Sequence, residues 1–128
     1  MTFLNKYKEH SYALLRIVSG YLFFWHGTQK GFDFPKAGPE QLNALMTLGT
    51  GIELIGGALI VLGLFTRYAA FVASGSMAVG YWLFHASQAN PALPLLNGGE
   101  LAIMFCFTFL YIASQGSGHW SLDKALNQ

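Results

Sequence analysis

The sequence predicts an all-α integral membrane protein, in which a single domain over residues 1–128 folds as an up-and-down bundle of four membrane-spanning helices. Hydrophobic residues make up 53% of the chain and charged residues 10%, whereas about 25% charged residues is usual in soluble domains. Because so few charges cannot cover the surface of a soluble globule, lipid is the expected solvent. Four apolar runs are separated by short polar or proline-containing segments. Each run is continuous rather than alternating, which favours helices over barrel strands.

The same composition excludes several classes of protein. The single cysteine, Cys106, excludes a disulfide scaffold and dithiol redox chemistry, and the apolar content excludes intrinsic disorder. The net charge is +1 without a basic run, so the electrostatic footprint of a nucleic-acid-binding protein is missing. Nothing in the sequence resembles a nucleotide-binding loop or a nucleophile elbow, and no catalytic residue is identified.

The first predicted span covers residues 11–30. It is interrupted by Arg16 and His26 and closed by Lys30. Lysines before the run also fit a secretory signal peptide, but the run is too long for one and no small-residue cleavage site follows His26. We therefore expect a retained span.

The second predicted span covers residues 48–65, with Glu53 as its only charge. Residues 31–46 before it contain two prolines, which predict a loop with a short interfacial helix after Pro39. The two residues after the span form a tight turn into the third.

The third predicted span covers residues 68–86 and the fourth residues 99–114. The segment 87–97 between them contains an Asn-Pro pair and a second proline, which indicates a loop. After the fourth span the sequence becomes a polar tail.

Ionisable residues inside the spans are expected to gather at one level, because they are costly in lipid and by default functional. Helical spacing places Glu53 on one face with Gly49 and Gly56, so this face is expected to contact a neighbouring helix closely. The alternating directions of the spans bring a titratable group from each helix to the outer third of the bundle. The candidate ligand-binding residues are His26, Lys30, Glu53, His85, Glu100, Trp25 and Trp82. The two tryptophans also fit an interfacial aromatic belt.

Two residues of the spans lie away from this cluster. Arg16 is near the inner end of the first span, where its side chain either extends to the headgroups or pairs inward. Cys106 faces the apolar middle of the fourth span and is expected to be a buried structural residue.

The cluster admits three kinds of ligand. Two His and two Glu can ligate zinc or iron, but no paired spacing such as Glu-x-x-His is present. His26 and His85 can ligate haem from two sides, although two carboxylates near the ring would be unusual. A quinone or similar amphiphile, hydrogen-bonded by His or Lys, is the third. We expect no metal and no intrinsic cofactor, with quinone as the candidate ligand.

Three segments resemble, in order and spacing, the DoxX family of small four-span bacterial membrane proteins. They are LLRIVSGYLFFWHGTQKGF (14–32), GIELIGGALIVLGLFTRYAA (51–70) and NGGELAIMFCFTFLYIASQGSGHWSLD (97–123). The resemblance assigns the family's polar positions to Arg16, His26, Lys30, Glu53, Arg67, Glu100 and Asp123. Of these, Arg16, Arg67 and Asp123 are expected to be structural. The tail at 115–118 departs slightly from the family's Gly-Pro-Gly.

The resemblance implies an inner-membrane location and association with redox complexes. Some members are subunits of a thiosulfate:quinone oxidoreductase, and others are linked to oxidative-stress assemblies. One hypothesis is a redox accessory subunit that binds quinone, works with a partner protein and has no independent enzymatic activity. The alternative is a non-enzymatic module, an assembly factor or small-solute carrier, whose buried charges only fix helix packing. The lipid bilayer, a redox partner and further copies of the chain are the expected partners.

Orientation is testable. The termini side carries Lys6, Lys8, Arg67 and Lys124, whereas the other side carries Lys30 and Lys36. The positive-inside rule therefore predicts both termini in the cytoplasm. A reporter that works only in the cytoplasm should be active after Gln128 and silent near Ala92. The reverse pattern would invert the bundle.

Overall fold

The computed structural model describes residues 2–127, and within this range it is helical with no strand. The elements are η1 (Thr2–Tyr7), α1 (Lys8–Phe32), α2 (Ala44–Gly51), η2 (Ile52–Gly56), α3 (Gly57–Leu62), α4 (Thr66–Gly80), η3 (Tyr81–His85), α5 (Pro94–Asn97), α6 (Glu100–Gln115) and α7 (Leu122–Leu126). The π-helical segments η2 and η3 continue α2 and α4, so α2–η2–α3 and α4–η3 are single helical runs. The predicted all-α class is confirmed.

The ends of the helices differ from the predicted bounds. The second run begins at Ala44, where the Asn43 side chain accepts a 2.8 Å bond from the Met46 amide. The short helix expected after Pro39 is therefore absent, and residues 33–43 are not helical. The run ends at Gly63, whose φ of +68° terminates the helix earlier than predicted. The short helix α5 lies within the predicted loop 87–97.

One helical run, Ala44–Leu62, is by itself long and apolar enough to cross a membrane. Glu100–Gln115 is a shorter apolar helix. The helical content is thus established, while the count of four spans stays a prediction.

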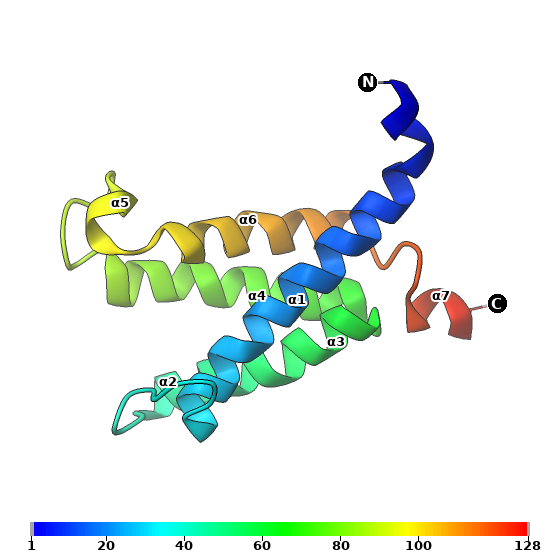
Figure 1. Ribbon diagram of the computed structural model, residues 1–128. Coiled ribbons are helices and arrows are strands. Elements are labelled where there is room, and N and C mark those ends of the chain that lie inside the picture. Colours follow the sequence, from blue (N-terminus) through cyan, green and yellow to red (C-terminus); the bar gives the residue numbers. More distant parts are fainter. Residues whose placement is uncertain (1, 128) are drawn as a thin grey trace.

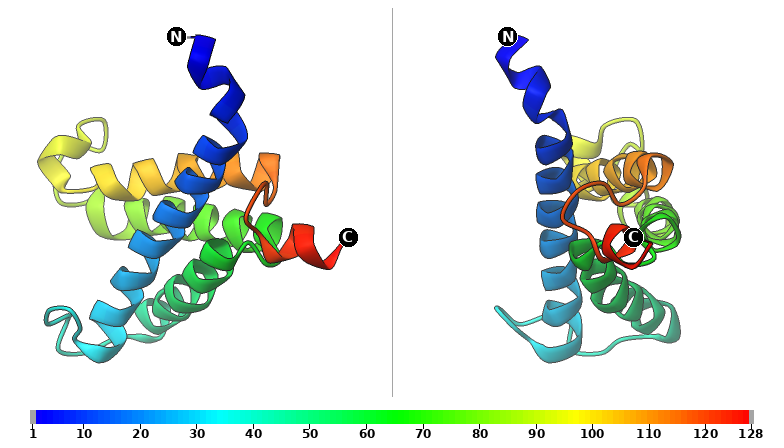
Figure 2. Two further views of the ribbon diagram at one scale, coloured as in Figure 1. Left: turned by 45° about the vertical axis from the view of Figure 1, so that its right-hand side comes forward. Right: turned by 90° about the vertical axis from the view of Figure 1, so that its right-hand side faces the viewer.

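The helices form two antiparallel pairs that are joined at one end. Helix α1 packs along η2 and α3, and α4 packs along α6. The two pairs lie close together near α7 and diverge toward α2 and α5 (Figure 1). The same divergence is visible from a second direction (Figure 2). The molecule therefore has a closed end and an open end.

Glycines determine how closely α1 and α3 approach. A Cβ atom on Gly20 would lie 2.9 Å from the Val61 nitrogen, and one on Gly57 would lie 2.9 Å from the Phe24 nitrogen. A side chain at either position would push the helices apart. Gly49, expected to support such a contact, does not: a Cβ there would meet no atom within 4 Å.

The core lies where the two pairs meet. Phe23, Ile60, Phe109 and Ile112 are fully buried. The Phe23 ring meets Phe109 edge-on at 4.8 Å between centroids, which is a favourable aromatic geometry. This contact joins α1 to α6 across the bundle.

The closed end is held by a buried arginine. Arg16 is fully buried, and its guanidinium donates to the carbonyl oxygens of Ile60 at 2.9 Å and Val61 at 3.1 Å. It also donates to the carbonyl oxygens of His119 at 3.1 Å and Trp120 at 2.8 Å. Of the two alternatives left open by the sequence, the structure has the inward one. Arg16 thereby attaches the C-terminal tail to the end of α3.

Asp123 attaches the same tail to the start of α4. Its carboxylate accepts hydrogen bonds from the amides of Phe65 at 2.8 Å and Thr66 at 3.0 Å, and its own amide donates to the Gly63 carbonyl at 2.8 Å. A Cβ on Gly63 would lie 2.3 Å from the Cβ of Ser121. The tail therefore lies directly on this glycine.

Arg67 and Tyr12 hold the end of α6. Arg67 donates to the carbonyl oxygens of Ala113 at 2.9 Å and Ser114 at 2.6 Å. The Tyr12 hydroxyl donates to the Gly116 carbonyl at 2.6 Å. We call Arg16 and Asp123, which bind the tail, together with Arg67, which binds the end of α6, the tail clasp.

The clasp gives a pH-dependent stability. Partial burial raises the pKa of Asp123, but the hydrogen bonds from the Thr66 and Phe65 amides outweigh it, so the pKa lies below its ordinary value of 3.8. A lowered pKa means that the charged group stabilises the fold above the ordinary value, and that this contribution is lost as pH falls through the folded-state pKa. We expect Asp123→Asn, which keeps one acceptor oxygen but loses the charge, to cost about 1 kcal/mol, the difference between hydrogen bonds to charged and to neutral groups.

Thermal melts of the detergent-solubilised protein check this prediction. The difference between wild type and Asp123→Asn should be present at neutral pH and shrink as pH falls below 3.8. Glu40→Gln, on an exposed loop residue, is the matched control and should leave the melting temperature unchanged. A difference of constant size at every pH would contradict the role of the charge.

Candidate functional site

A cavity of about 760 Å³ opens between the diverging helix pairs. The run α2–η2 and the run α4–η3 form its walls, and α1 and α6 also contribute residues. Most of the lining is apolar, including Phe23, Phe84 and Phe105. An apolar cavity with a few polar groups is the usual form of a small-molecule site.

Four of the predicted site residues line this cavity. They are His26, Lys30, Glu53 and His85, from α1, η2 and η3. Residues far apart in sequence are therefore gathered at one place, as the depth argument expected. The His26 ring lies edge-on to Phe105, with 5.9 Å between centroids.

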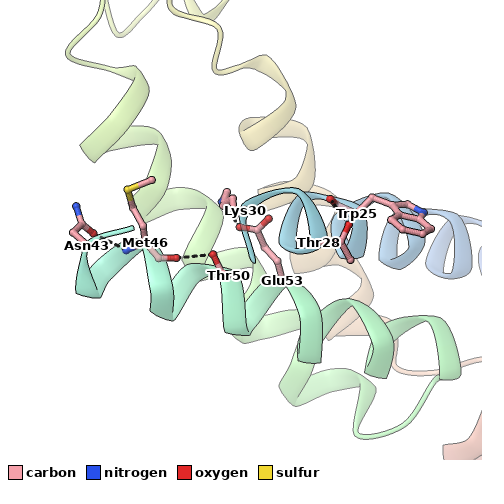
Figure 3. A network of polar contacts seen from close by, with 7 residues as sticks. All are labelled: Trp25, Thr28, Lys30, Asn43, Met46, Thr50 and Glu53. Carbon is pink, nitrogen blue, oxygen red and sulfur yellow. Dashed lines mark hydrogen bonds and ion pairs between the residues drawn. The ribbon is translucent and has the colours of Figure 1, made fainter. Parts of the chain in front are cut away.

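Lys30 and Glu53 form an ion pair between α1 and η2. The ammonium group of Lys30 bonds to Oε1 of Glu53, and Figure 3 shows the two side chains meeting between the helices. Glu53 is 1% exposed, whereas the Lys30 side chain is 32% exposed. The second carboxylate oxygen, Oε2, is buried without a hydrogen-bond partner among the described residues. A buried acceptor without a partner is rare and marks a potential binding atom.

Local backbone features bring this pair together. Glu53 lies in the π-helical segment η2, and single π-helical turns are frequent at functional sites. A Cβ on Gly27 would lie 3.1 Å from the Glu53 Cβ and 2.8 Å from Leu54 Cγ. Only glycine therefore lets α1 approach closely enough for Lys30 to reach the carboxylate.

His85 is oriented by the loop before α6. Its Nδ1 lies 3.2 Å from the carbonyl oxygen of Asn97. Because a carbonyl oxygen only accepts, Nδ1 carries a proton here, which leaves Nε2 for a second partner. The Asn97 side chain donates to the Tyr81 hydroxyl at 3.0 Å. Sequence reasoning missed Tyr81 and Asn97, although Asn97 opens the Asn-Gly-Gly-Glu-Leu motif.

Three predicted site residues lie elsewhere. Glu100 is exposed in the first turn of α6, where a carboxylate is favoured by the helix dipole. Trp82 is 64% exposed on the outer surface. Trp25 packs against Phe34, with ring centroids 5.6 Å apart. None of the three lines the cavity, because their rotation about the helix axis turns them away from it.

The cavity is kept open by glycines that were not predicted as site residues. A Cβ on Gly49, Gly75 or Gly80 would meet no atom within 4 Å, and all three line the cavity. Their missing side chains leave space for a ligand.

The two-His, two-Glu ligand set considered from the sequence is not assembled. Within residues 2–127, no group of three or more His, Cys, Asp or Glu residues is placed to hold one metal ion. The polar side-chain groups of the cavity are one ion pair, a free carboxylate oxygen, two imidazoles and the hydroxyl of Ser76. They can bind the head group of an organic molecule by hydrogen bonds.

The chain is similar to known bacterial proteins over nearly its whole length. A family model described as DoxX matches residues 11–86. A Haemophilus influenzae protein with the name "Uncharacterized protein" is 43% identical, over 97% of this chain and 96% of that protein. A Bacillus subtilis protein with the name "Putative oxidoreductase CatD" is 29% identical, over 94% of this chain and 90% of that protein. No solved structure matches.

Because Lys30 and Glu53 form an ion pair, we expect the effects of substituting them on stability to be non-additive. Lys30→Met leaves a buried carboxylate without its partner, and Glu53→Gln leaves the ammonium without a counter-charge, so each should lower the melting temperature in detergent. The double variant should be more stable than the sum of the two effects, by roughly 0.5–3 kcal/mol. The lower half of that range is expected because solvent screens the partly exposed Lys30.

Lys36→Met combined with Glu53→Gln is the matched control. Lys36 is exposed on the following loop, so its effect should add to that of Glu53→Gln. Strict additivity for the Lys30 pair as well would show that the two side chains do not interact.

Proposed function

This chain belongs to the DoxX family, and from that membership we propose that it is an accessory subunit of a membrane redox complex. In this proposal it binds a quinone or a similar amphiphile in the cavity between its helix pairs. One observation carries the proposal: a large apolar cavity ends in a buried, only half-satisfied Glu53–Lys30 pair.

The protein lies in a bacterial membrane and contacts the lipid bilayer. The outward face of α1 is apolar, with Leu14, Val18 and Leu22 about half exposed, as expected for a surface that faces lipid rather than water. We further propose that all four long helical runs cross the inner membrane, with both termini in the cytoplasm.

The lining of the cavity suits an aromatic ring with polar substituents. The ammonium group of Lys30 has three N–H donors. One of them bonds to Glu53, and another can donate a hydrogen bond to a ring carbonyl. His85 and Glu53 supply acceptors for a hydroxyl group. Phe23, Phe84 and Phe105 provide apolar surface for the ring.

The proposed role is accessory because the chain supplies no electron carrier of its own. Cys106 is the only cysteine in the sequence, so no dithiol can form within one chain. Electrons would have to come from a partner protein. The name of the Bacillus subtilis relative, which includes "oxidoreductase", supports a redox setting.

A second candidate is a non-enzymatic membrane module, an assembly factor or small-solute carrier. The tail clasp favours it, because Arg16, Arg67 and Asp123 serve only to join helix ends and the tail. In that case the Lys30–Glu53 pair would likewise fix helix packing.

Quinone binding by the purified protein decides between the two. In phosphatidylcholine nanodiscs we expect benzoquinone without a side chain to bind, and Lys30→Met to weaken binding about tenfold, as for a lost hydrogen bond to a charged group. Gly75→Leu, at a lining position where an added Cβ would meet no atom within 4 Å, should also weaken it. Lys36→Met should have no effect. Equal or absent binding in all four proteins would favour the non-enzymatic module.

A further inference from the structure

A second depression lies beside the cavity, along the same two helical runs. This groove has a volume of about 670 Å³. It is lined by Ala44, Thr47, Leu48, Gly51, Ile52, Ile55, Gly56, Leu59, Phe65, Tyr68, Ala69 and Val72. No charged residue is among them, and only Thr47 and Tyr68 carry a polar side-chain group. The groove is therefore almost entirely apolar.

The groove and the cavity are neighbours that share a boundary. Leu48, Ile52 and Val72 line both. All the charged and imidazole side chains of the lining lie on the cavity side of this boundary. The cleft between the runs thus has a polar end and an apolar end.

Open space continues along the groove. A Cβ on Gly51 would meet no atom within 4 Å, and Gly51 lines the groove but not the cavity. Gly75 lines the cavity but not the groove, and a Cβ on it would likewise meet no atom within 4 Å. The two glycines therefore mark the two parts of the cleft separately.

From this arrangement we infer that the groove holds the apolar chain of the amphiphile whose head group occupies the cavity. The ligand class is then a ring or other polar head with a long apolar chain, and not a free small molecule. The inference rests on the proposed function and extends it, because it needs a head group bound beside Glu53 and Lys30.

The free energies of the apolar chain and of the head group determine which part of the ligand gives affinity. Lipid tails are as apolar as the groove, so a chain that moves from lipid to protein gains little from the hydrophobic effect. Affinity comes from hydrogen bonds to the head group, which are strong when one partner is charged. The groove determines where the chain lies once the head group is bound. A fatty acid without a fitting head group should therefore not collect there.

Photolabelling in phosphatidylcholine nanodiscs tests the position of the chain. The probe is a benzoquinone with a decyl chain that ends in a diazirine, and the comparison compound is decanoic acid with the same diazirine. Peptide mass spectrometry should find the quinone label on residues 44–59 and 65–72, about tenfold above the fatty acid, as expected for one strong polar anchor. An excess of chainless benzoquinone should remove the excess labelling.

Three substitutions separate the parts of the site. Gly51→Leu should reduce groove labelling several-fold and leave the binding of chainless benzoquinone unchanged. Gly75→Leu should reduce both. Val18→Phe adds bulk to an outward position that is 50% exposed and lines neither depression, so it should change neither. Leucine has a higher helix propensity than glycine, so these variants should fold.

The experiment distinguishes a failure of the proposed function from a failure of this inference alone. If chainless benzoquinone does not bind wild type, the proposed function fails and the inference fails with it. If benzoquinone binds but the diazirine labels the outer faces of α1 and α6 as strongly as the groove, the inference alone is overturned. Insensitivity of groove labelling to Gly51→Leu would overturn it as well.

Discussion

The arrangement of the whole molecule depends on the burial of Arg16. A guanidinium removed from solvent is costly unless hydrogen-bond acceptors surround it. The acceptors are backbone carbonyls from the end of α3 and from the tail, so α1, α3 and the tail must meet at one point. Asp123 then attaches the same tail to the start of α4, and Arg67, on α4, bonds the carbonyl oxygens at the end of α6. The buried Arg16 thus fixes the closed end of the first helix pair, and Asp123 and Arg67 connect the second pair to it.

Fixing one end leaves the other free to diverge, and the cleft between the helix pairs follows from this. Close packing of α1 on α3 is confined to glycines such as Gly20 and Gly57. Toward the open end, Gly49 and Gly80 face empty space instead. Glycine therefore allows two helices to pack closely in one place and widens the cavity in another. The effect depends on whether the backbone of a neighbouring helix lies opposite the glycine.

The sequence was informative where a feature depends on residues that are near one another in the chain, or on the cost of placing a charge in lipid. Continuous apolar runs predicted the helices, and the cost of a charge in lipid predicted that Lys30 and Glu53 would meet. The failures have different causes. Trp25, Trp82 and Glu100 were assigned to the cluster by their depth along the spans, and depth does not fix the direction of a side chain around the helix axis. For Trp82 the π-helical geometry of η3, with more residues per turn than an α-helix, changes that direction further. The tail clasp depends on contacts between residues more than forty positions apart, which no periodicity reveals.

Five charged residues that bond between elements divide into two groups by what they bond. Arg16, Arg67 and Asp123 bond backbone groups at helix ends, and none of them lines the cavity or the groove. Lys30 and Glu53 bond each other, border the cavity, and leave one carboxylate oxygen without a partner. A protein that needed only a rigid packing element could satisfy that oxygen with one hydroxyl or amide nearby. The free acceptor therefore lies at the polar end of an apolar cleft, where the ligand that we propose would supply the missing donor.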